Sequence, residues 1–500
     1  MVEYPTMWRK YERLLICLII VVYIVLAAAM ARVRAPDADE GSFGNAAVVF
    51  GTKHILAMPM RNRVWLPGLD SHLYVTAPLY FVGLSLWFKL FGAAIVTMRY
   101  FSVFWGVVGL IAWYFIVNAL TKNRGVALLS MALIALNYDY INLTSERYDP
   151  MVAALNAAGM AVYIVLRERN FPVAVFISNV LVAAAFVTHP YGLFGFAGLA
   201  LLCLSLDRQK LSVKVLALAA TPYVLALAGW GTYIAQEPRL FWTQFHGNAS
   251  GRLSHLFSPW TAFVAEIHDR YIVLFGGWRP GVPVYMKIKT LILITIFVSI
   301  CGCLLSAEIR RVRGHRIILS LTGLWFLMLM LLEGTKLYNY LLLIWPIYFV
   351  IVAIWLESLI RKGGWLRYAS IVGICLLVIF AITSIGYRAR LNSYQNAFLP
   401  ALRYLQENVK GNDLVVGSGS FGFGLDFEKH VLDDHQLGYS VGEVPEYIVI
   451  DKQYSDQINA SRRPKPDLYR YVQNMLSSRY QIVFSDHSGP DFYRIYRKVN

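Results

Sequence analysis

The sequence predicts an α-helical polytopic membrane protein, with about 11 transmembrane helices and a small C-terminal α/β domain outside the membrane. Hydrophobic residues make up 57% of the 500 residues and charged residues only 15%, whereas soluble domains are about 45–50% apolar and about 25% charged. The apolar residues form runs of about 20, the length that crosses a bilayer as a helix. The composition changes after about residue 388, where shorter alternating segments begin.

The apolar runs occur in order along the chain and are separated by short charged segments. Each run is long enough, or nearly so, for one membrane crossing. We expect eleven spans, near residues 14–30, 101–120, 125–141, 151–166, 171–187, 191–206, 213–234, 284–305, 317–332, 341–357 and 368–387.

The distribution of Lys and Arg between these spans predicts the orientation. If the N-terminus is cytoplasmic, the inside segments carry 17 Lys and Arg residues, whereas the short outside segments carry only Arg147 and Lys336. Lys and Arg accumulate on the cytoplasmic side of membrane proteins. The net charge of +16 is therefore explained by topology. The Lys and Arg residues are scattered between the apolar runs and not gathered on one helix or face, which argues against a nucleic-acid partner. The C-terminal tail and two long loops, 31–100 and 235–283, then lie outside.

Two segments allow alternatives. Residues 78–92 are apolar enough for a further span, but that span would invert every later loop, so we expect a helix lying against the outer interface. The N-terminus resembles a secretory signal, with basic residues, an apolar stretch and small residues. We expect an uncleaved anchor, because polar residues that look functional follow it at once.

The chain divides into a membrane domain, residues 1–390, and an outer domain, residues 391–500. The outer domain reads as a helix followed by β-rich segments such as EYIVID and YQIVFSD. Residues 417–422 match the pattern GxGxxG, but no clear helix follows, and a dinucleotide site needs one. The five cysteines lie inside apolar runs without CxxC spacing, so we expect no disulfide and no cysteine metal site.

Polar residues gather in the outer segments next to the membrane. Charged groups at such positions are costly unless they have a function. They suggest a site for an anionic, lipid-anchored substrate. The candidates are Asp39 and Glu40 after the first span, Arg147 and Asp149 in a short loop with Ser145 and Glu146, His189 in a second loop, and Lys336, Tyr338 and Tyr340 in a third.

Several motifs together resemble a known family. Pro36-Asp37-Ala38-Asp39-Glu40 reads PxxDE, Ala77–Tyr80 reads APLY with LFG and Arg99 behind it, and Lys336–Tyr340 reads KLxxY followed by Pro346. With Asp149 in the second outer loop, this order is similar to the GT-C superfamily of polyprenyl-phosphate-sugar glycosyltransferases. The likeness is greatest to the branch of protein O-mannosyltransferases and the aminoarabinose transferase of lipid A.

The resemblance implies the roles of individual residues. The catalytic acid corresponds to Asp39 with Glu40 beside it, and substrate binding corresponds to Asp149, Lys336 and Tyr340. Phe43 and Thr76-Ala77-Pro78-Leu79 stand where the lipid A enzymes carry a Tyr and KPPL. The missing lysine argues against aminoarabinose transfer to lipid A. The expected location is the bacterial inner membrane, with the outer domain in the periplasm.

The expected reaction is inverting transfer of a sugar from a polyprenyl-phosphate donor to an acceptor hydroxyl on a glycan, lipid or protein. Asp39 would act as general base, and Lys336 would stabilise the phosphate leaving group. No cofactor is required, although Asp39 and Asp149 could hold a divalent cation. In loop 235–283 several residues could contact phosphate or acceptor and are unranked: Arg239, His246, Arg252, His255, His268 and Arg270. The alternatives are an oligosaccharyltransferase or ligase of a preassembled glycan and a lipid or solute transporter.

Overall fold

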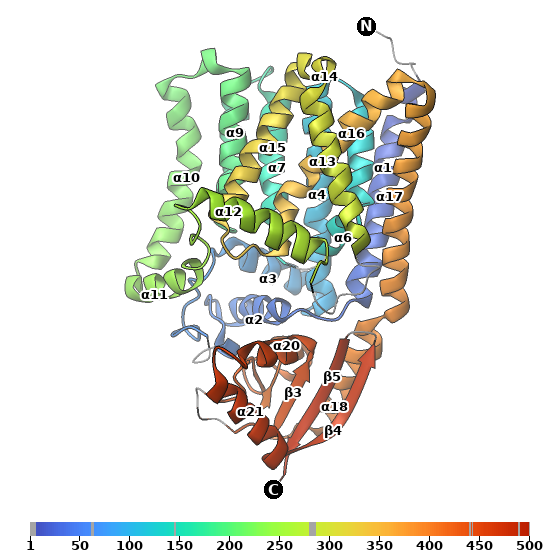
Figure 1. Ribbon diagram of the computed structural model, residues 1–500. Coiled ribbons are helices and arrows are strands. Elements are labelled where there is room, and N and C mark those ends of the chain that lie inside the picture. Colours follow the sequence, from blue (N-terminus) through green and yellow to red (C-terminus); the bar gives the residue numbers. More distant parts are fainter. Residues whose placement is uncertain are drawn as a thin grey trace.

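A computed structural model describes residues 7–61, 65–144, 147–279, 287–439, 442, 444–488 and 491–499. It consists of a bundle of long helices with a small α/β domain at one end (Figure 1). The helix α1 (Met7–Val33) begins at the end of the bundle away from that domain. The predicted fold class is confirmed: the structure is a polytopic helical bundle with a C-terminal sheet.

Each of the eleven predicted spans contains a helix. Within the described ranges, seven helices are long and apolar enough to cross a membrane, and shorter apolar helices accompany them. The seven are α1, α4 (Ile95–Thr121), α7 (Asp149–Leu166), α10 (Val213–Ile234), α15 (Arg313–Leu332), α16 (Leu341–Lys362) and α17 (Gly364–Leu391). The other four spans correspond to α5 (Arg124–Ala135), α8 (Phe171–Phe186), α9 (Gly192–Leu206) and α13 (Lys289–Leu305).

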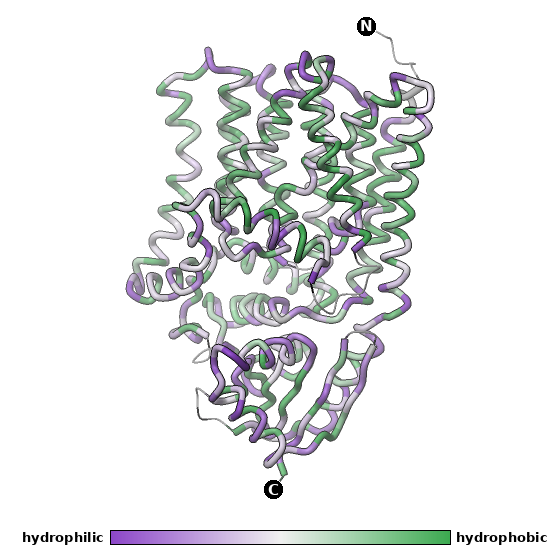
Figure 2. Tube along the Cα trace, viewed as in Figure 1, coloured by the Kyte–Doolittle hydropathy of each residue, from purple (hydrophilic) through white to green (hydrophobic). Residues whose placement is uncertain are grey.

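The helices are apolar both inside the bundle and on its outer surface (Figure 2). Helix α16 is buried on nearly all sides, and its Trp345 is completely enclosed. Outer positions such as Leu227 and Phe297 are each 67% exposed. Soluble proteins rarely expose so much contiguous apolar surface. A surrounding lipid phase explains why these helices lack a polar face.

Shorter helices cross the end of the bundle nearest the α/β domain. Helix α2 (Ala38–Lys53) and helix α3 (Leu79–Phe91) lie there, with the turn η1 (Pro59–Arg61) between them in sequence. Helix α3 is the segment expected at the outer interface, and its 13 residues are too few to cross a bilayer. Between α10 and α13, the second long loop forms α11 (Pro238–Ala249), α12 (Pro259–Ala265) and the π-helix η3 (Glu266–Phe275).

The C-terminal domain is built on a five-stranded sheet of order β2-β1-β3-β5-β4. The strands β2 (Val431–Leu432), β1 (Val415–Val416) and β3 (Tyr447–Asp451) run parallel, whereas β5 (Asp491–Lys498) is antiparallel to β3 and β4 (Tyr480–Ser488). Successive residues of β3 face opposite sides. Val449 packs with α18 (Leu399–Asn408), and Ile448 packs with α20 (Lys452–Ser461) and α21 (Pro466–Arg479).

The C-terminal domain docks directly on α2. The glycine-rich segment forms the turn η7 (Gly419–Phe421) and the short helix α19 (Gly422–Leu425). A Cβ atom on Gly41 of α2 would lie 2.1 Å from the carbonyl carbon of Gly419, so side chains here would force the two apart. The Ser420 hydroxyl donates to the Asp37 carbonyl oxygen at 3.0 Å. Of the GxGxxG glycines, Gly419 therefore serves close docking between the domains, whereas Gly417 and Gly422 pack against Val449 and Phe427 of the C-terminal domain itself.

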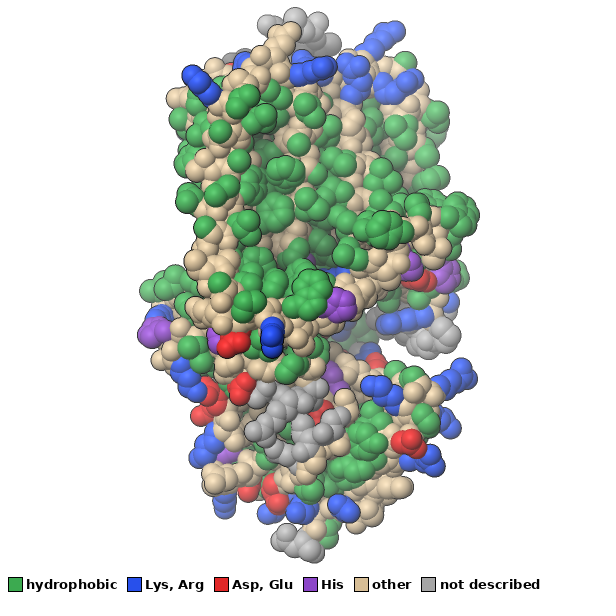
Figure 3. Space-filling view, turned by 90° about the vertical axis from the view of Figure 1, so that its left-hand side faces the viewer, with side chains coloured by type: hydrophobic (Ala, Val, Ile, Leu, Met, Phe, Trp, Pro, Cys, Tyr) green, Lys and Arg blue, Asp and Glu red, His purple; other side chains and the backbone are tan. Residues whose placement is uncertain are grey.

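Lys and Arg side chains cluster at the end of the bundle farthest from the C-terminal domain (Figure 3). In intact spheroplasts of a cysteine-free background, Lys122→Cys and Arg310→Cys should therefore resist an impermeant thiol reagent. Arg470→Cys should react, because the Arg470 side chain is 72% exposed on the C-terminal domain. Labelling of the first two sites without permeabilisation would reverse the predicted orientation.

Candidate functional site

The first outer helix begins at a tightly held corner. Asp37 is the N-cap of α2: its side chain accepts from the Asp39 N–H at 3.0 Å, and Glu40 accepts from the Asp37 N–H at 2.8 Å. This reciprocal capping satisfies amide groups that a helix start leaves without partners. Burial, together with the nearby Asp39 carboxylate, raises the pKa of Asp37. The capping box thereby fixes where Asp39 and Glu40 point.

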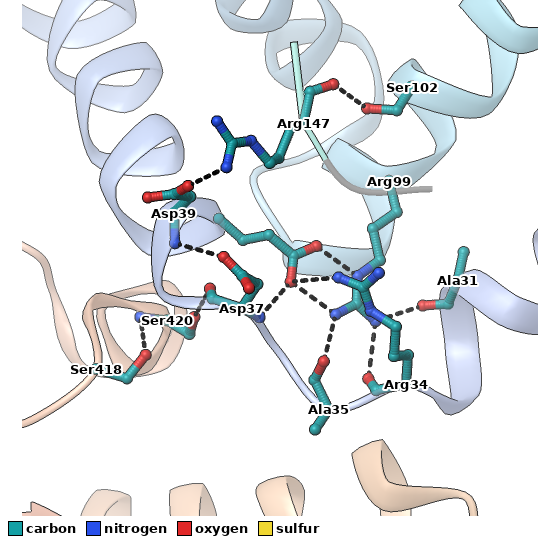
Figure 4. A network of polar contacts seen from close by, with 11 residues as sticks. Ala31, Arg34, Ala35, Asp37, Asp39, Arg99, Ser102, Arg147, Ser418 and Ser420 are labelled. Atoms are coloured by element: carbon teal, nitrogen blue, oxygen red, sulfur yellow. Dashed lines mark hydrogen bonds and ion pairs between the residues drawn. The ribbon is translucent and has the colours of Figure 1, made fainter. Parts of the chain in front are cut away.

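Glu40 faces the interior of the protein. Its side chain is completely buried, and its two oxygens accept from Arg99 Nε at 2.6 Å and Nη2 at 2.7 Å. The same guanidinium donates to the carbonyls of Ala31 and Arg34, at the turn between α1 and α2 (Figure 4). Glu40 was predicted to be catalytic with Asp39. This enclosed geometry instead favours a positioning role, because a carboxylate with no exposed surface does not contact a substrate.

Asp39 faces the other way and remains accessible. Its side chain is 36% exposed and contacts Arg147, whose Nη1 lies 2.5 Å from Asp39 Oδ2 (Figure 4). Successive helix residues are about 100° apart around the axis. Two adjacent acids can therefore occupy unlike environments, one in the core and one at the surface.

Arg147 connects both predicted aspartates. Its Nε lies 3.2 Å from Asp149 Oδ2, and its guanidinium lies over the rings of Phe43 and Tyr148. Burial alone would lower the pKa of Arg147, but the Asp39 carboxylate raises it well above its usual value, so Arg147 stays charged. Asp149 opens α7 in front of Pro150 and also suits the positive end of that helix. Ser145 and Glu146, named with this loop, lie outside the described residues.

An aromatic cluster joins the second and third outer loops to this site. His189 stacks on Tyr148, with ring centroids 4.9 Å apart, and its Nδ1 accepts from the Tyr191 N–H. Burial and the cations Arg252 and Arg147 lower the pKa of His189 well below its usual value, so the ring is neutral at pH 7. The Tyr340 hydroxyl lies 3.4 Å from that of Tyr148. His189 and Tyr340 therefore lie in one cluster with Arg147.

Arg252 is the further cation at this cluster. Its Nη1 donates to the Tyr340 hydroxyl at 2.5 Å, and its guanidinium lies 5.4 Å from the centre of that ring. Arg252 was one of six unranked candidates, and loop spacing offered no signal to select it. The contact depends on how α11 and the following turns fold back over the third loop, where the Gly334 N–H donates to the Arg252 carbonyl at 2.6 Å.

Lys336 occupies a different environment from the predicted one. Its side chain is 3% exposed, and its ammonium lies 3.1 Å from Glu266 Oε2 and donates to the Met330 carbonyl at 2.6 Å. Arg270 bridges Glu266 and Glu333 at 3.2 and 3.0 Å, completing a buried network. Burial lowers the pKa of Lys336 although Glu266 opposes the shift. Lys336 therefore clamps the third loop onto η3 and presents no open face to a phosphate.

Tyr338 belongs to a second polar cluster. Its hydroxyl donates to Asp139 Oδ1 at 2.8 Å, and the Lys289 ammonium lies 2.6 Å from the same oxygen. Asp139 lies on the short helix α6 (Tyr138–Leu143), and Lys289 begins α13. The sequence carries no signal for either residue, because Asp139 lies within the apolar run 125–141 and Lys289 lies near the start of a different run, 284–305. The structure thus separates Tyr338 from Tyr340, two residues along the chain.

A cavity of about 470 Å³ lies between the membrane domain and the C-terminal domain. Asp37 contributes to its wall from the α2 corner, and Asp451, Asp456 and Tyr493 contribute from the C-terminal domain. Among the described residues, no group of three or more His, Cys, Asp and Glu is placed to hold a metal ion. Between Asp39 and Asp149, the pair suggested for a divalent cation, the Arg147 guanidinium contacts both carboxylates.

Comparisons with known proteins identify the fold. No family model and no curated protein matches the sequence. Among solved structures, ArnT, an aminoarabinose transferase, from Cupriavidus metallidurans bound to undecaprenyl phosphate aligns with a TM-score of 0.58 at 12% identity, over 97% of this chain and 98% of that chain.

Two structures of an archaeal oligosaccharyltransferase from Archaeoglobus fulgidus align as well. AglB in complex with an inhibitory peptide and a dolichol-phosphate gives a TM-score of 0.55 at 10% identity, covering 97% of this chain and 74% of that chain. The oligosaccharyltransferase in complex with Zn and sulfate gives a TM-score of 0.55 at 12% identity, covering 95% of this chain and 72% of that chain. This chain therefore has the GT-C fold, and the resemblance seen in its motifs is confirmed at the level of the fold.

The buried network predicts that Lys336 acts mainly on stability. Lys336→Met should lower stability by about 1.5–3 kcal/mol, because the buried Glu266 loses one of its two cations and keeps only Arg270. Glu266→Gln/Lys336→Met should recover much of the loss, since no unpaired charge remains. The measurement is thermal unfolding in detergent, with Lys89→Met as the control at an exposed interfacial lysine. Equal, small shifts for Lys336→Met and Lys89→Met would contradict the clamp.

Proposed function

We propose that this chain is an integral-membrane glycosyltransferase that transfers a sugar from a polyprenyl-phosphate donor to an acceptor hydroxyl. The observation that carries the proposal is Asp39, an accessible carboxylate held by a capping box at the end of a GT-C bundle. Two cations, Arg147 and Arg252, lie in the same polar cluster. A base beside cations is the arrangement that transfer from a phosphate leaving group requires.

A lipid-linked phosphate donor is supported by two kinds of evidence. Structural neighbours of this fold are described with undecaprenyl phosphate and with a dolichol-phosphate. In this chain, Arg147 donates to the Tyr148 hydroxyl and Arg252 to the Tyr340 hydroxyl, at the end of the bundle nearest the C-terminal domain. Arginine presents planar pairs of donors that match phosphate oxygens. Arg252 therefore replaces Lys336 as the proposed ligand of the leaving phosphate.

The proposed chemistry is a single displacement. The acceptor hydroxyl gives its proton to an Asp39 carboxylate oxygen as its own oxygen bonds to the anomeric carbon of the sugar. The bond from that carbon to the phosphate oxygen breaks, and the electron pair leaves with the lipid phosphate. Attack opposite the leaving group inverts the anomeric configuration. Such general-base assistance contributes roughly 10² to 10⁴-fold, while Arg147 and Arg252 offset the charge that develops on the phosphate.

Neighbouring residues hold this arrangement in place. Asp149 and Tyr148 both contact Arg147, so they orient its guanidinium between the carboxylates. His189 stacks on Tyr148 and is neutral, so it packs within the aromatic cluster without adding charge. Glu40 acts through Arg99 by keeping the start of α2 in position. Tyr338 is not part of this proposed donor site, because it is engaged with Asp139.

The acceptor is proposed to approach through the cavity between the two domains. Asp37 lines that cavity and accepts from the backbone N–H of Asp39, so the cavity wall lies two residues along the chain from the proposed base, whose own side chain is not in that wall. Its wall combines carboxylates, amides and the aromatic residues Phe492 and Tyr493 with three cations, Arg34, Arg388 and Lys452, and this mixture can hydrogen-bond to hydroxylated molecules. Glycans, lipid headgroups and hydroxylated protein segments all fit this description.

The proposed location is the bacterial inner membrane, with the N-terminus in the cytoplasm and the C-terminal domain in the periplasm. The separation between the basic end of the bundle and the end that holds Asp39 supports it. No cofactor is required by the proposed steps, and a divalent cation remains compatible with them. An oligosaccharyltransferase is the second candidate, favoured by the AglB likeness. It would transfer a preassembled glycan in place of one sugar.

Asp39→Asn should reduce transfer at least roughly 10²-fold, because the amide keeps the shape of the carboxylate but accepts no proton. Its thermal stability should fall less than that of Glu40→Gln, since the Asp39 side chain is partly exposed and the buried Arg147 keeps Asp149 as a second carboxylate partner. Glu40→Gln is the matched comparison: it should lower stability, because Arg99 is left buried beside a neutral partner. The assay is transfer from a polyprenyl-phosphate sugar in detergent. Retention of more than about a tenth of the activity by Asp39→Asn would exclude Asp39 as the base.

Arg252→Ala should weaken use of the donor more than it weakens folding. Removing one charge-assisted contact to a phosphate should raise the donor KM by about tenfold or more. Arg239→Ala is the control, because Arg239 is exposed on α11 of the same outer segment. The measurement is transfer rate against donor concentration. If the two variants behave alike, Arg252 does not contact the donor.

A further inference from the structure

A second polar cavity lies at the end of the bundle opposite Asp39. Its volume is about 780 Å³, and it is enclosed by the turn between α4 and α5, the end of α7 and the beginning of α15. Four cations and one acid contribute to its wall: Lys122, Arg124, Arg167, Arg313 and Glu168. The proposed glycosyl transfer uses none of these residues, so the cavity needs a separate explanation.

The positive charge of this cavity is only partly neutralised by the protein. Arg124 pairs with Glu12, and Arg167 pairs with Asp207 at 2.9 Å and with Glu168 at 2.7 Å. Arg313 instead donates to a neutral group, the Ser205 carbonyl. Lys122 is exposed, and in the described part of the chain no acid pairs with its ammonium. An anion in the cavity would therefore meet two cations, Lys122 and Arg313, that no carboxylate among the described residues neutralises.

The start of α15 adds to this positive potential. Val312, its N-cap, offers no side-chain hydrogen bond to the first turn. Gly314 is pressed against α4, since a Cβ there would lie 1.9 Å from the Leu120 carbonyl oxygen. The N-terminus of this 20-residue helix, at Val312, Arg313 and Gly314, thus lies in the wall of the cavity. Helix N-termini carry partial positive charge and bind phosphate groups.

Below the cations the cavity is apolar. Its lower wall is continuous with the lipid-facing surface of the bundle, where Val165 is 41% exposed. A charged rim above an apolar wall matches a molecule with a phosphate headgroup and acyl chains. The apolar lining residues are Ala119, Leu120, Ile164, Val165, Leu206, Val312 and Ile317.

We infer that this cavity binds the phosphate headgroup of an anionic phospholipid from the leaflet at the basic end of the bundle. The lipid would bridge α4, α7 and α15, with its phosphate between Lys122 and Arg313 and its acyl chains along the bundle surface. The inference does not rest on the proposed transfer reaction. It differs from the general accumulation of Lys and Arg at this end, because it requires particular cations around one cavity.

The test is native mass spectrometry of the full chain in detergent, titrated with phosphatidylglycerol, with phosphatidylcholine and with inorganic phosphate. Lys122→Ala/Arg313→Ala should weaken phosphatidylglycerol binding about tenfold or more, since each cation near a lipid surface contributes about 1 kcal/mol. Arg208→Ala/Arg310→Ala is the matched control, which removes two exposed cations from the same end outside the cavity. Lys122→Arg/Arg313→Lys should keep the binding.

Three results would overturn the inference. Equal losses in the cavity and control variants would show that charge at this end acts without a site. Equal binding of phosphatidylcholine would remove the requirement for an anionic headgroup. Displacement of phosphatidylglycerol by inorganic phosphate at similar concentrations would assign the cavity to a free anion. Both cavity residues lie at the surface, so size-exclusion profiles and thermal stability should remain unchanged and keep these results interpretable.

Discussion

The ion pair between Glu40 and Arg99 is the contact on which the arrangement of this protein depends. Arg99 reaches from α4 to the turn after α1, where it also holds backbone carbonyls of Ala31 and Arg34. One guanidinium therefore ties the end of the first span to the start of α2. A buried charge pair of this kind is weak evidence for added stability, but loss of one partner is costly. The effect of the Glu40–Arg99 pair here is geometric: it holds Glu40 in the interior, so the neighbouring Asp39 on α2 faces outward.

The membrane architecture could be predicted from the sequence because the bilayer imposes simple rules. Spans must be apolar and about 20 residues long. Each of the eleven predicted spans contains a helix, and among the described residues seven of these helices are long and apolar enough to cross a membrane. The motif around Asp39 and Glu40 could also be recognised. The sequence could not predict which of the two acids is buried, because that depends on Arg99, which lies 59 residues after Glu40. Adjacent acids in a sequence look equivalent until a helix places them on different faces.

Lys336 and Arg252 show a second limit of sequence reasoning. Lys336 follows a recognisable motif, yet its partner Glu266 lies in the long outer loop, where no periodicity marks it. Arg252 lies in the same loop without any motif and meets Tyr340 only because the loop folds back. Long-range pairing of charged groups is set by packing of irregular segments. Such segments carry few sequence signals, whereas the spans carry many.

The docking of the C-terminal domain on α2 has a consequence for how the protein is made. The start of α2 is held from one side by Arg99 and from the other by η7, which follows it by almost 400 residues. Membrane proteins are synthesised from the N-terminus, so α2 emerges long before its second support exists. The segment that bears Asp39 would then lack its second support until the C-terminal domain has been synthesised and folded. Maturation of the site would thus be coupled to synthesis of the C-terminal domain, and a chain interrupted before η7 would be left with the bundle but without the finished site.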